Sequence, residues 1–356
     1  MNSLQLHRQL VQQLMALGMP ASKPQIANLA LLCQALAVSP NCHLATLALG
    51  LPLPGQRENL IQRVRRILKN EQLDRSGCYR SLVRNLFQHW TDCEVNLVMD
   101  RTDLADRWSV LTLGAAYHKR LLPLAWQVIP FGATSADEQL ALVKRVQPDL
   151  PPARRVHFYG DAEFRAVALQ QYCQDQHWHW QVGLKSDLYI QTIDGLWQPL
   201  RDLRLTVGER RYVQKVYLTK EYRFGPVNLI ADWSPNQESP RYWALDQLAD
   251  AHAWRRGRKR FWIEPTFRDW KSCGFDLENS RLDDPERLDT LLLGMATTVL
   301  WMIYLGEWLI RRKRQQELAP PDQRDYSIFR LGRDYVQRCR TMNWRLPVGF
   351  AVQHLV

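Results

Sequence analysis

The change of hydrophobic period along residues 94–184 constrains the fold of this chain more than any other feature. Strand-like apolar runs occur at 95–100, 108–118, 121–130, 156–161 and 178–184. Helical periodicity separates the later runs, at 135–146 and 163–175. Three strands followed by helix, strand, helix and strand is typical of a mixed α/β sheet. We therefore predict that this part of the chain forms an α/β core.

Residues 1–90 precede this core and are predicted to be helical. Apolar residues recur at three- and four-residue spacing over 5–17, 25–36 and 57–68, with Gly- and Pro-containing breaks between them. The third stretch carries the basic residues Arg57, Arg63, Arg65, Arg66 and Lys69. A solvated helix face is the common reason for such a charge run, and docking in a DNA groove is the functional alternative.

Residues 186–246 interrupt the α/β order. β-forming residues concentrate at 188–192, 211–219, 227–233 and 241–245. We predict an all-β insertion at 186–246 within a core made of 91–185 and 247–317. A helical tail at 318–356 would follow, with a Pro-rich break at Pro320 and Pro321 and a last helix near 328–340.

The run from Leu291 to Gly306 contains sixteen residues without a charge, between Asp289 and Glu307. A membrane span needs roughly 20 such residues. We therefore predict a buried helix, beginning near Arg287 and packed on the sheet, with a membrane helix as the alternative.

The overall charge narrows the class of partner. The formal net charge is +11, which favours a polyanionic partner such as nucleic acid or an acidic membrane surface. The seven cysteines are scattered and include no CxxC pair, so reduced thiols are expected rather than a disulfide framework or a zinc site.

Two acids stand at the ends of apolar strands, Asp100 after 95–99 and Asp161 after 156–160. Ligands bind at this edge of open α/β sheets. If the two strands are neighbours, the carboxylates lie close together, which is costly unless a proton or a cation intervenes. Oxygen ligands without His or Cys favour Mg²⁺, with Mn²⁺ as a substitute. A turn or a helix cap is the ordinary role of such an Asp, and Asp161 could cap the helix that follows it.

A third acid, Glu264, lies in the basic and aromatic segment 258–271. At helical pitch Glu264, Arg268 and Lys271 share one face, which Arg260 joins if the helix begins early enough. The neighbouring stripe of Ile263, Phe267 and Trp270 would face a core, and Pro265 would lie in the first turn. Three carboxylates can hold two metal ions about 4 Å apart for phosphoryl transfer. An amphipathic helix with a basic outer face is the alternative.

This pattern resembles the DDE transposases of bacterial insertion sequences, in the branch with a Tyr-x2-Arg-x3-Glu-x6-Lys signature. Arg260, Glu264 and Lys271 match that spacing, whereas Gly257 stands at the tyrosine position. Residues 99–102 are similar to the first-acid motif, and residues 160–164 correspond to the second, which in the family usually reads Asp-Arg-Gly-Phe. The resemblance extends over about 90–335.

The resemblance implies a ribonuclease-H-like core with a β insertion, and a two-metal site that uses Mg²⁺, or Mn²⁺ in its place. Asp100, Asp161 and Glu264 would be its catalytic metal ligands. Arg260, Arg268 and Lys271 would hold the DNA backbone. Trp243, in the insertion, would stack on a base flipped out near the transposon end, or would be a core residue instead.

The activity implied is cleavage of double-stranded transposon ends and joining of the 3′-hydroxyl to target DNA. Residues 1–90 would help to bind the terminal inverted repeats. A DNA-dependent homodimer, a cytoplasmic, nucleoid-associated location and no membrane partner are expected. The alternatives are a transposase-derived DNA-binding protein that no longer cuts, a stand-alone nuclease of the same fold, and a membrane-associated basic protein.

Overall fold

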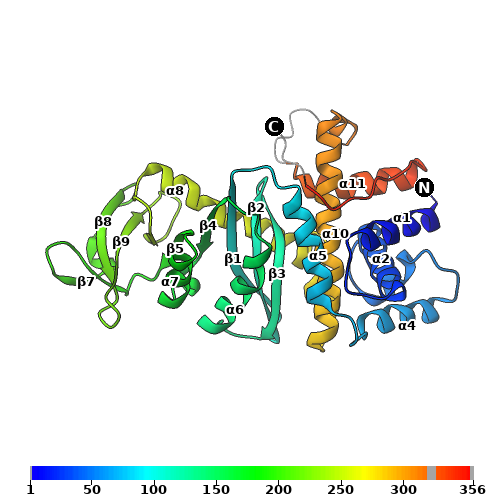
Figure 1. The fold of residues 1–356 in the computed structure, drawn as a ribbon, viewed down its shortest axis with the longest axis horizontal. Helices are drawn as coiled ribbons and strands as arrows, with labels where there is room; N and C mark the ends of the chain where they lie inside the picture. Colours follow the sequence, from blue (N-terminus) through cyan, green and yellow to red (C-terminus); the bar gives the residue numbers. More distant parts are fainter. Residues whose placement is uncertain (1, 319–325, 353–356) are drawn as a thin grey trace.

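A computed structural model describes residues 2–318 and 326–352 of the chain. Its described residues form a mixed α/β protein that is built on one long sheet, with helices on both faces of the sheet's first half (Figure 1). The insertion strands lie at one end of the elongated molecule and the N-terminal helices lie at the other.

The sheet contains ten strands in the order β3-β2-β1-β4-β5-β10-β9-β8-β6-β7. Their bounds are β1 Glu94–Leu104, β2 Trp108–Tyr117, β3 Arg120–Pro130, β4 Arg155–Gly160, β5 His179–Leu184, β6 Tyr189–Gln191, β7 Trp197–Pro199, β8 Arg210–Leu218, β9 Phe224–Asp232 and β10 Arg241–Leu245. The strands β1, β2 and β3 form an antiparallel meander, whereas β1, β4 and β5 run parallel. Burial on both faces explains why the central strands are nearly continuous apolar runs in the sequence.

The predicted insertion is not detached from this sheet. β10 pairs antiparallel with β5 on one side and with β9 on the other, so the insertion strands extend the sheet of the core. A side chain on β10 therefore lies only one strand away from the parallel part of the sheet.

Helices cover the sheet and continue beyond it. Their bounds are α1 Ser3–Ala16, α2 Lys23–Val38, α3 Leu44–Gly50, α4 Arg57–Leu68, α5 Arg75–Gln88, α6 Ala136–Val146, α7 Val167–Asp175, α8 Ala251–Gly257, α9 Ile263–Arg268, α10 Pro285–Arg311 and α11 Ile328–Thr341. Short 3₁₀ segments η1 Gln147–Asp149, η2 Ala162–Phe164, η3 Leu200–Leu203, η4 Arg258–Trp262, η6 Leu277–Ser280 and η7 Gln315–Glu317, and the π-helical turn η5 Asp269–Cys273, complete the described elements.

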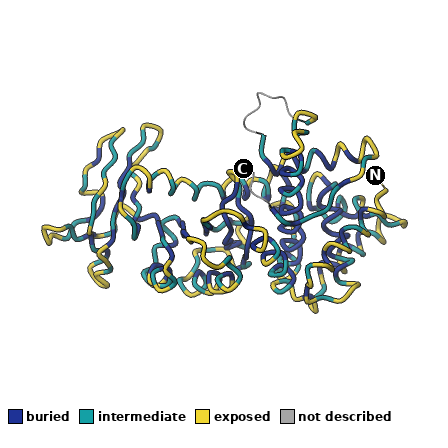
Figure 2. The backbone as a smooth tube through the Cα atoms, turned by 45° about the horizontal axis from the view of Figure 1, so that its top comes forward, coloured by how far each residue is buried: buried dark blue, intermediate teal, exposed yellow. Residues whose placement is uncertain are grey.

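The central helix α10 contains the charge-free run and is buried as predicted. It is long and apolar enough to cross a membrane, yet 89% of its most apolar 18-residue window is covered by the rest of the protein. It packs between β3 and α5 on one side and α2 and α11 on the other. Figure 2 shows that buried residues run through the interior of the molecule, whereas exposed residues lie mainly on its outside.

The N-terminal helices share one hydrophobic core with α10 and the sheet rather than forming a core of their own. Leu32 and Leu36 of α2 lie against Gly294 of α10, where a Cβ atom would stand 2.6 Å from Leu32 Cδ2. On the far side, a Cβ at Gly332 of α11 would stand 1.9 Å from the carbonyl oxygen of Met302. Glycine is therefore required for the close approach of α10 and α11.

The periodicity located most elements to within a few residues. It did not single out α3, α5 or the short strand β7. The predicted helix at 163–175 begins instead as η2, and the helix α7 starts only at Val167. Pro320 and Pro321 of the predicted tail lie outside the described residues.

Candidate active site

Asp100 and Asp161 lie on neighbouring strands. Asp161 directly follows β4, as predicted, but Asp100 lies within β1, which continues to Leu104 through its pairing with β2, so the prediction that Asp100 ends its strand is wrong. The parallel pairing of β1 with β4 places Val98 opposite Tyr159, two residues before each acid. Because side chains alternate between faces, both acids follow on the same face. The expectation that the two strands are neighbours is therefore confirmed, and the two carboxylates are adjacent.

Asp161 is held between a helix cap and two glycines. Its Oδ1 accepts a hydrogen bond of 2.8 Å from the N–H of Glu163, so it does cap η2, as the ordinary reading of the sequence allowed. A Cβ atom at Gly183 of β5 would stand 2.8 Å from the backbone nitrogen of Ala162. A Cβ at Gly160 would stand 2.6 Å from Phe164 Cβ. The backbone at Asp161 therefore tolerates no bulk beside it.

Glu264 is carried by a continuous helical segment that changes from 3₁₀ to α at Ile263, two residues before Pro265. Pro265 has no N–H to donate to the carbonyl of Phe261, and its ring would clash with that carbonyl in a regular α-helix. The turn before it, η4, is accordingly 3₁₀, and α9 begins at Ile263 with Pro265 in its first turn. Glu264 emerges on the exposed side, with 56% of its side chain accessible.

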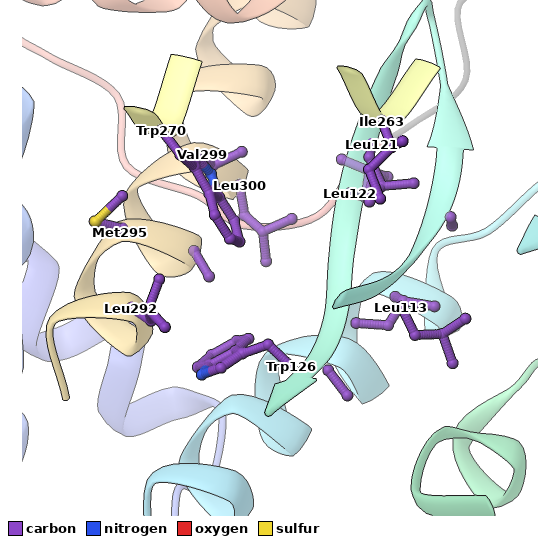
Figure 3. Packing of buried hydrophobic residues seen from close by; sticks show 14 of the residues in the cluster. Leu113, Leu121, Leu122, Trp126, Ile263, Trp270, Leu292, Met295, Val299 and Leu300 are labelled. Carbon is purple, nitrogen blue, oxygen red and sulfur yellow. The ribbon is translucent and has the colours of Figure 1, made fainter. Parts of the chain in front are cut away.

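The opposite side of this segment is anchored in the core. Ile263, Phe267 and Trp270 are buried, as the predicted stripe requires. Figure 3 shows Ile263 beside Leu121 and Leu122 of β3, and Trp270 beside Val299 and Leu300 of α10. The hydroxyl of Thr266 also accepts a 2.9 Å hydrogen bond from the N–H of Leu121. These contacts fix the backbone that presents Glu264.

Arg260 lies between the first and third acids. Its Nη1 is 3.4 Å from Asp100 Oδ2, and its Nη2 is 3.9 Å from Glu264 Oε1. The guanidinium also covers the ring of Phe261, at 4.6 Å from the ring centroid. Arg260 therefore joins the acidic face, although η4 rather than a regular α-helix carries it there.

The charges of Asp161 and Glu264 both act on Asp100. Burial raises the pKa of Asp100 to about 6, the cation of Arg260 opposes this rise, and the charges of Asp161 and Glu264 add to it. A carboxylate in this position is therefore deprotonated at neutral pH only against the repulsion of its two neighbours. A cation at this edge of the sheet would be stabilised by all three.

The donor set fits a hard divalent cation. Three carboxylates without a His or Cys partner are the ligands that Mg²⁺ or Mn²⁺ prefers. Among residues 2–318 and 326–352, no group of three Asp, Glu, His or Cys side chains is placed so that it could hold a metal ion. Glu264 is exposed, with Arg260 Nη2 3.9 Å from its carboxylate, whereas Asp100 is mostly buried and held by the N–H of Arg101 at 2.8 Å.

The structure separates the predicted DNA-binding residues on α9 and η5. Arg268 is exposed on the same side as Glu264. Lys271 forms an ion pair of 2.7 Å with Glu278 and does not turn toward the three acids. The π-helical turn at 269–273 alters the rotation per residue that placed Lys271 with Glu264 in a regular helix.

Trp243 lies on β10 in the same transverse row as Asp161. Trp243 pairs with Gly183 of β5. Gly160 pairs with Val182, so Gly183 is level with Asp161, the next residue after Gly160. Two strand spacings, about 10 Å, therefore separate Trp243 from the second acid. Trp243 is half-buried and packs with Trp254 against a small apolar cluster, so it has both a core contact and an open side.

The open side of Trp243 belongs to a groove of about 840 Å³ between the insertion and the segment that carries Glu264. The groove combines aromatic and basic side chains and ends at Pro265, next to Glu264. Its lining includes Lys119, Arg241, Trp243, Trp254, Arg255, Arg258, Phe261 and Trp262. Trp254 is enclosed by cations, with Arg210 at 3.4 Å and Arg258 at 5.6 Å from its ring.

Sequence reasoning assigned no role to Arg101, Glu163 or Gly183. Arg101 and Glu163 stand within the two acid motifs, and that position was the only signal in the sequence. Gly183 could not be recognised as a site residue from the sequence, because its role depends on contact with the backbone that follows β4. Gly257, at the tyrosine position of the signature, has the Gln181 side chain in its place, since a Cβ there would stand 2.2 Å from Gln181 Nε2.

Comparison with known proteins identifies the class of protein that this fold and site define. Residues 102–301 match the transposase DDE domain family, which is more than half of the chain. The match begins two residues after Asp100 and includes Asp161 and Glu264. The chain belongs to this family and is a transposase, a DNA-cutting and DNA-joining enzyme by class.

Two further comparisons give little beyond this. A search of curated proteins found no match. Among solved structures, the cryo-EM structure of the piggyBac transposase synaptic complex with hairpin DNA is similar, at 9% sequence identity and a TM-score of 0.47. The similarity covers 93% of this chain and 76% of that chain.

Proposed function

We propose that this chain is the transposase of a bacterial insertion sequence, which cleaves the ends of its element and joins the 3′-hydroxyl to target DNA. The observation that carries the proposal is that Arg260 contacts both Asp100 and Glu264, beside the paired strands β1 and β4 that position Asp100 and Asp161, inside a chain that belongs to the DDE family. The matched spacing of Arg260, Glu264 and Lys271 supports the Tyr-Arg-Glu-Lys branch.

The topology supports a ribonuclease-H-like core at 91–185 and 247–317. The five strands β1 to β5 run in the order 3-2-1-4-5, with an antiparallel meander next to a parallel half. The insertion at 186–246 continues the same sheet toward the groove. We retain 1–90 as a helical DNA-end-binding region and 318–356 as a helical tail.

Mg²⁺, or Mn²⁺ in its place, would be held by Asp100, Asp161 and Glu264. Bound divalent ions would supply the charge that activates the attacking oxygen and stabilises the leaving oxygen of the displaced strand. The chain's own contribution is position: Asp100 and Asp161 each accept a hydrogen bond from a backbone N–H through Oδ1, and Asp100 Oδ2 faces Arg260 Nη1 at 3.4 Å. Glu264 completes the set from a helix anchored in the core.

Cationic and aromatic side chains around the acids would hold the DNA. Arg260 lies between Asp100 and Glu264 and next to Phe261 of the groove, a place from which a guanidinium reaches a phosphate beside the scissile bond. Exposed Arg268 would contact the backbone further along. Lys271 would do so after leaving Glu278. The groove with Trp243 would receive an unpaired base by stacking.

We further propose that the protein works as a DNA-dependent homodimer on paired ends, in the cytoplasm at the nucleoid. The net charge of +11 supports a polyanionic partner of this kind.

The decisive experiment incubates the purified chain with end DNA of its element and Mg²⁺ or Mn²⁺, and resolves nicked, hairpin and joined products. Asp100→Asn, Asp161→Asn and Glu264→Gln keep the shape of each side chain and remove its charge. Each is expected to abolish cleavage and to retain DNA binding in a gel-shift assay. Glu221→Gln, at an exposed position between β8 and β9, is the control and should retain cleavage.

The outcomes separate the alternatives. Cleavage that persists in one of the three variants removes that residue from the site. Binding of end DNA without any cleavage by the wild type points to a transposase-derived DNA-binding protein. Cleavage without strand joining points to a stand-alone nuclease.

A further inference from the structure

We propose that the Arg101–Glu163 ion pair is a positioning device that sets the spacing of Asp100 and Asp161. The inference rests on the proposed function, because it takes these two acids as metal ligands. It assigns a role to two residues that touch neither DNA nor the three-acid face and that act through their neighbours.

The backbone of each acid motif holds the side chain of its acid. The N–H of Arg101 donates to Asp100 Oδ1 at 2.8 Å. The N–H of Glu163 donates to Asp161 Oδ1, also at 2.8 Å. The rotamer of each acid is therefore fixed by the backbone of a residue one or two positions further along the chain.

The side chains of Arg101 and Glu163 contact each other. Arg101 Nε lies 3.2 Å from both carboxylate oxygens of Glu163, so one guanidinium N–H is shared by the two oxygens. The side chains are 19% and 21% exposed, and an ion pair shielded in this way is weakened little by salt. The contact links the two motifs in one chain of interactions, from Asp100 through Arg101 and Glu163 to Asp161.

Further hydrogen bonds and ion pairs hold the side chains of Arg101 and Glu163 in place. Arg101 also contacts Asp103 and donates to Ser109 Oγ at 3.2 Å, which ties it to β1 and β2. Glu163 Oε1 accepts from the N–H and the hydroxyl of Thr134, at 2.8 and 2.6 Å, at the start of α6. Both partners are thus fixed by elements other than the acid motifs, and the pair can hold the two motifs at a constant distance.

The location separates this device from the acidic face. Successive side chains of a strand point to opposite faces, so Arg101 points away from the face on which Asp100 meets Arg260. Partners of this kind, outside the ligands themselves, contribute about 10- to 100-fold to metal affinity or activity in metalloenzymes. We expect an effect of that size here.

The test measures Mn²⁺ binding to the full-length protein without DNA, by the loss of the electron paramagnetic resonance signal of free Mn²⁺. Arg101→Ala and Glu163→Gln should each weaken binding by about 10- to 100-fold. The double variant should lose no more than the stronger single variant, because both remove one link. Arg101→Lys, which keeps the charge and loses the shared N–H geometry, should lie between Arg101→Ala and the wild type.

A matched control exists on the same pair of strands. Arg155 and Glu94 form an ion pair of 3.0 Å that joins β4 to β1 at the end remote from the acids. Arg155→Ala should leave Mn²⁺ affinity unchanged. Equal losses in Arg155→Ala and Arg101→Ala would show a general structural effect and overturn the assignment.

A second readout does not depend on metal. Hydrogen–deuterium exchange of the metal-free protein should become faster at 98–104 and 160–165 in Arg101→Ala and remain unchanged at the remote end of β1. Should Arg101→Ala fail to fold, Thr134→Val offers a milder variant that removes one hydroxyl from Glu163. Unchanged exchange and unchanged Mn²⁺ affinity in the folded variants would overturn the proposal. Absence of DNA cleavage by the wild type would instead count against the proposed function alone.

Discussion

Gly183 lies so close to Asp161 that a Cβ atom added to it would stand 3.0 Å from the carbonyl carbon of Asp161 and 2.8 Å from the nitrogen of Ala162. Both of these atoms belong to the backbone, which cannot rotate away as a flexible side chain would. The second acid of the site thus depends on a glycine of the neighbouring strand.

Gly183→Ala is accordingly expected to displace the backbone at Asp161. Overpacking of this kind costs about 1–3 kcal/mol of unfolding free energy. DNA cleavage should fall more than ten-fold, because the acid moves relative to Asp100. Thermal unfolding and a cleavage assay measure the two effects. Ser186→Ala, an exposed position just after the same strand, is the control. Wild-type cleavage by Gly183→Ala would contradict the close packing described.

The stability of the protein should depend on pH through Asp269. Burial raises the pKa of Asp269 from its ordinary value of 3.8 to about 6, although the guanidiniums of Arg120 and Arg333 oppose the rise. The folded state then holds a proton that the unfolded state has released between about pH 4 and 6. The free energy of unfolding should therefore fall as pH rises through this window, by roughly 2–3 kcal/mol from this group.

Chemical denaturation of the wild type and of Asp269→Asn from pH 4 to pH 8 measures this contribution. The difference between the two curves should change between pH 4 and 6 and stay constant above. Parallel curves over the whole range would show that Asp269 does not titrate in this window.

Trp243 offers a test of the groove. Stacking of one base on an aromatic side chain contributes about 1–3 kcal/mol. Trp243→Ala should weaken binding of end DNA that carries an unpaired base by an amount in that range, and should change binding of fully paired duplex little. Fluorescence anisotropy with the two DNAs measures the difference. Trp197→Ala, on the edge strand β7, is the matched control. Equal losses for the two DNAs would assign Trp243 to core packing.

The basic face of α4 can be examined by salt dependence. Arg65, Arg66 and Lys69 are exposed there, whereas Arg63 is engaged by Asn28 at 2.6 Å. If the three exposed cations contact phosphates, each alanine variant should lower the slope of log affinity against log salt by about 1. Arg8→Ala, exposed on α1, should leave the slope unchanged. Slopes equal to the wild type in all three α4 variants would remove this helix from the DNA interface.

Local pattern was sufficient for much of the site. The apolar runs before Asp100 and Asp161 are strands because β-forming residues favour them, and the acids follow on the same face because β1 and β4 pair in parallel. The stripe of Ile263, Phe267 and Trp270 gave the buried face of the segment that carries Glu264. The prediction that Lys271 shares the face of Glu264 assumed the rotation per residue of a regular α-helix. The π-helical turn at 269–273 changes that rotation.

Contacts between distant segments were beyond the sequence. The pairing of β10 with β5 brings Trp243 into the row of Asp161, and it results from a register that no local periodicity encodes. Arg101 and Glu163 are 62 residues apart in the chain, so their contact exists only once β1 and β4 are paired.

The sequence by itself determined which segments become strands and helices, and it marked three acids and a basic, aromatic segment, because propensity and periodicity are local properties. The tertiary structure alone decided that β1 pairs with β4 beside the segment that carries Glu264, that Gly183 makes room for the backbone at Asp161 and that a single core joins the N-terminal helices to the sheet. These features depend on close packing and on burial of charge, and both are set by neighbours that the chain supplies from far away.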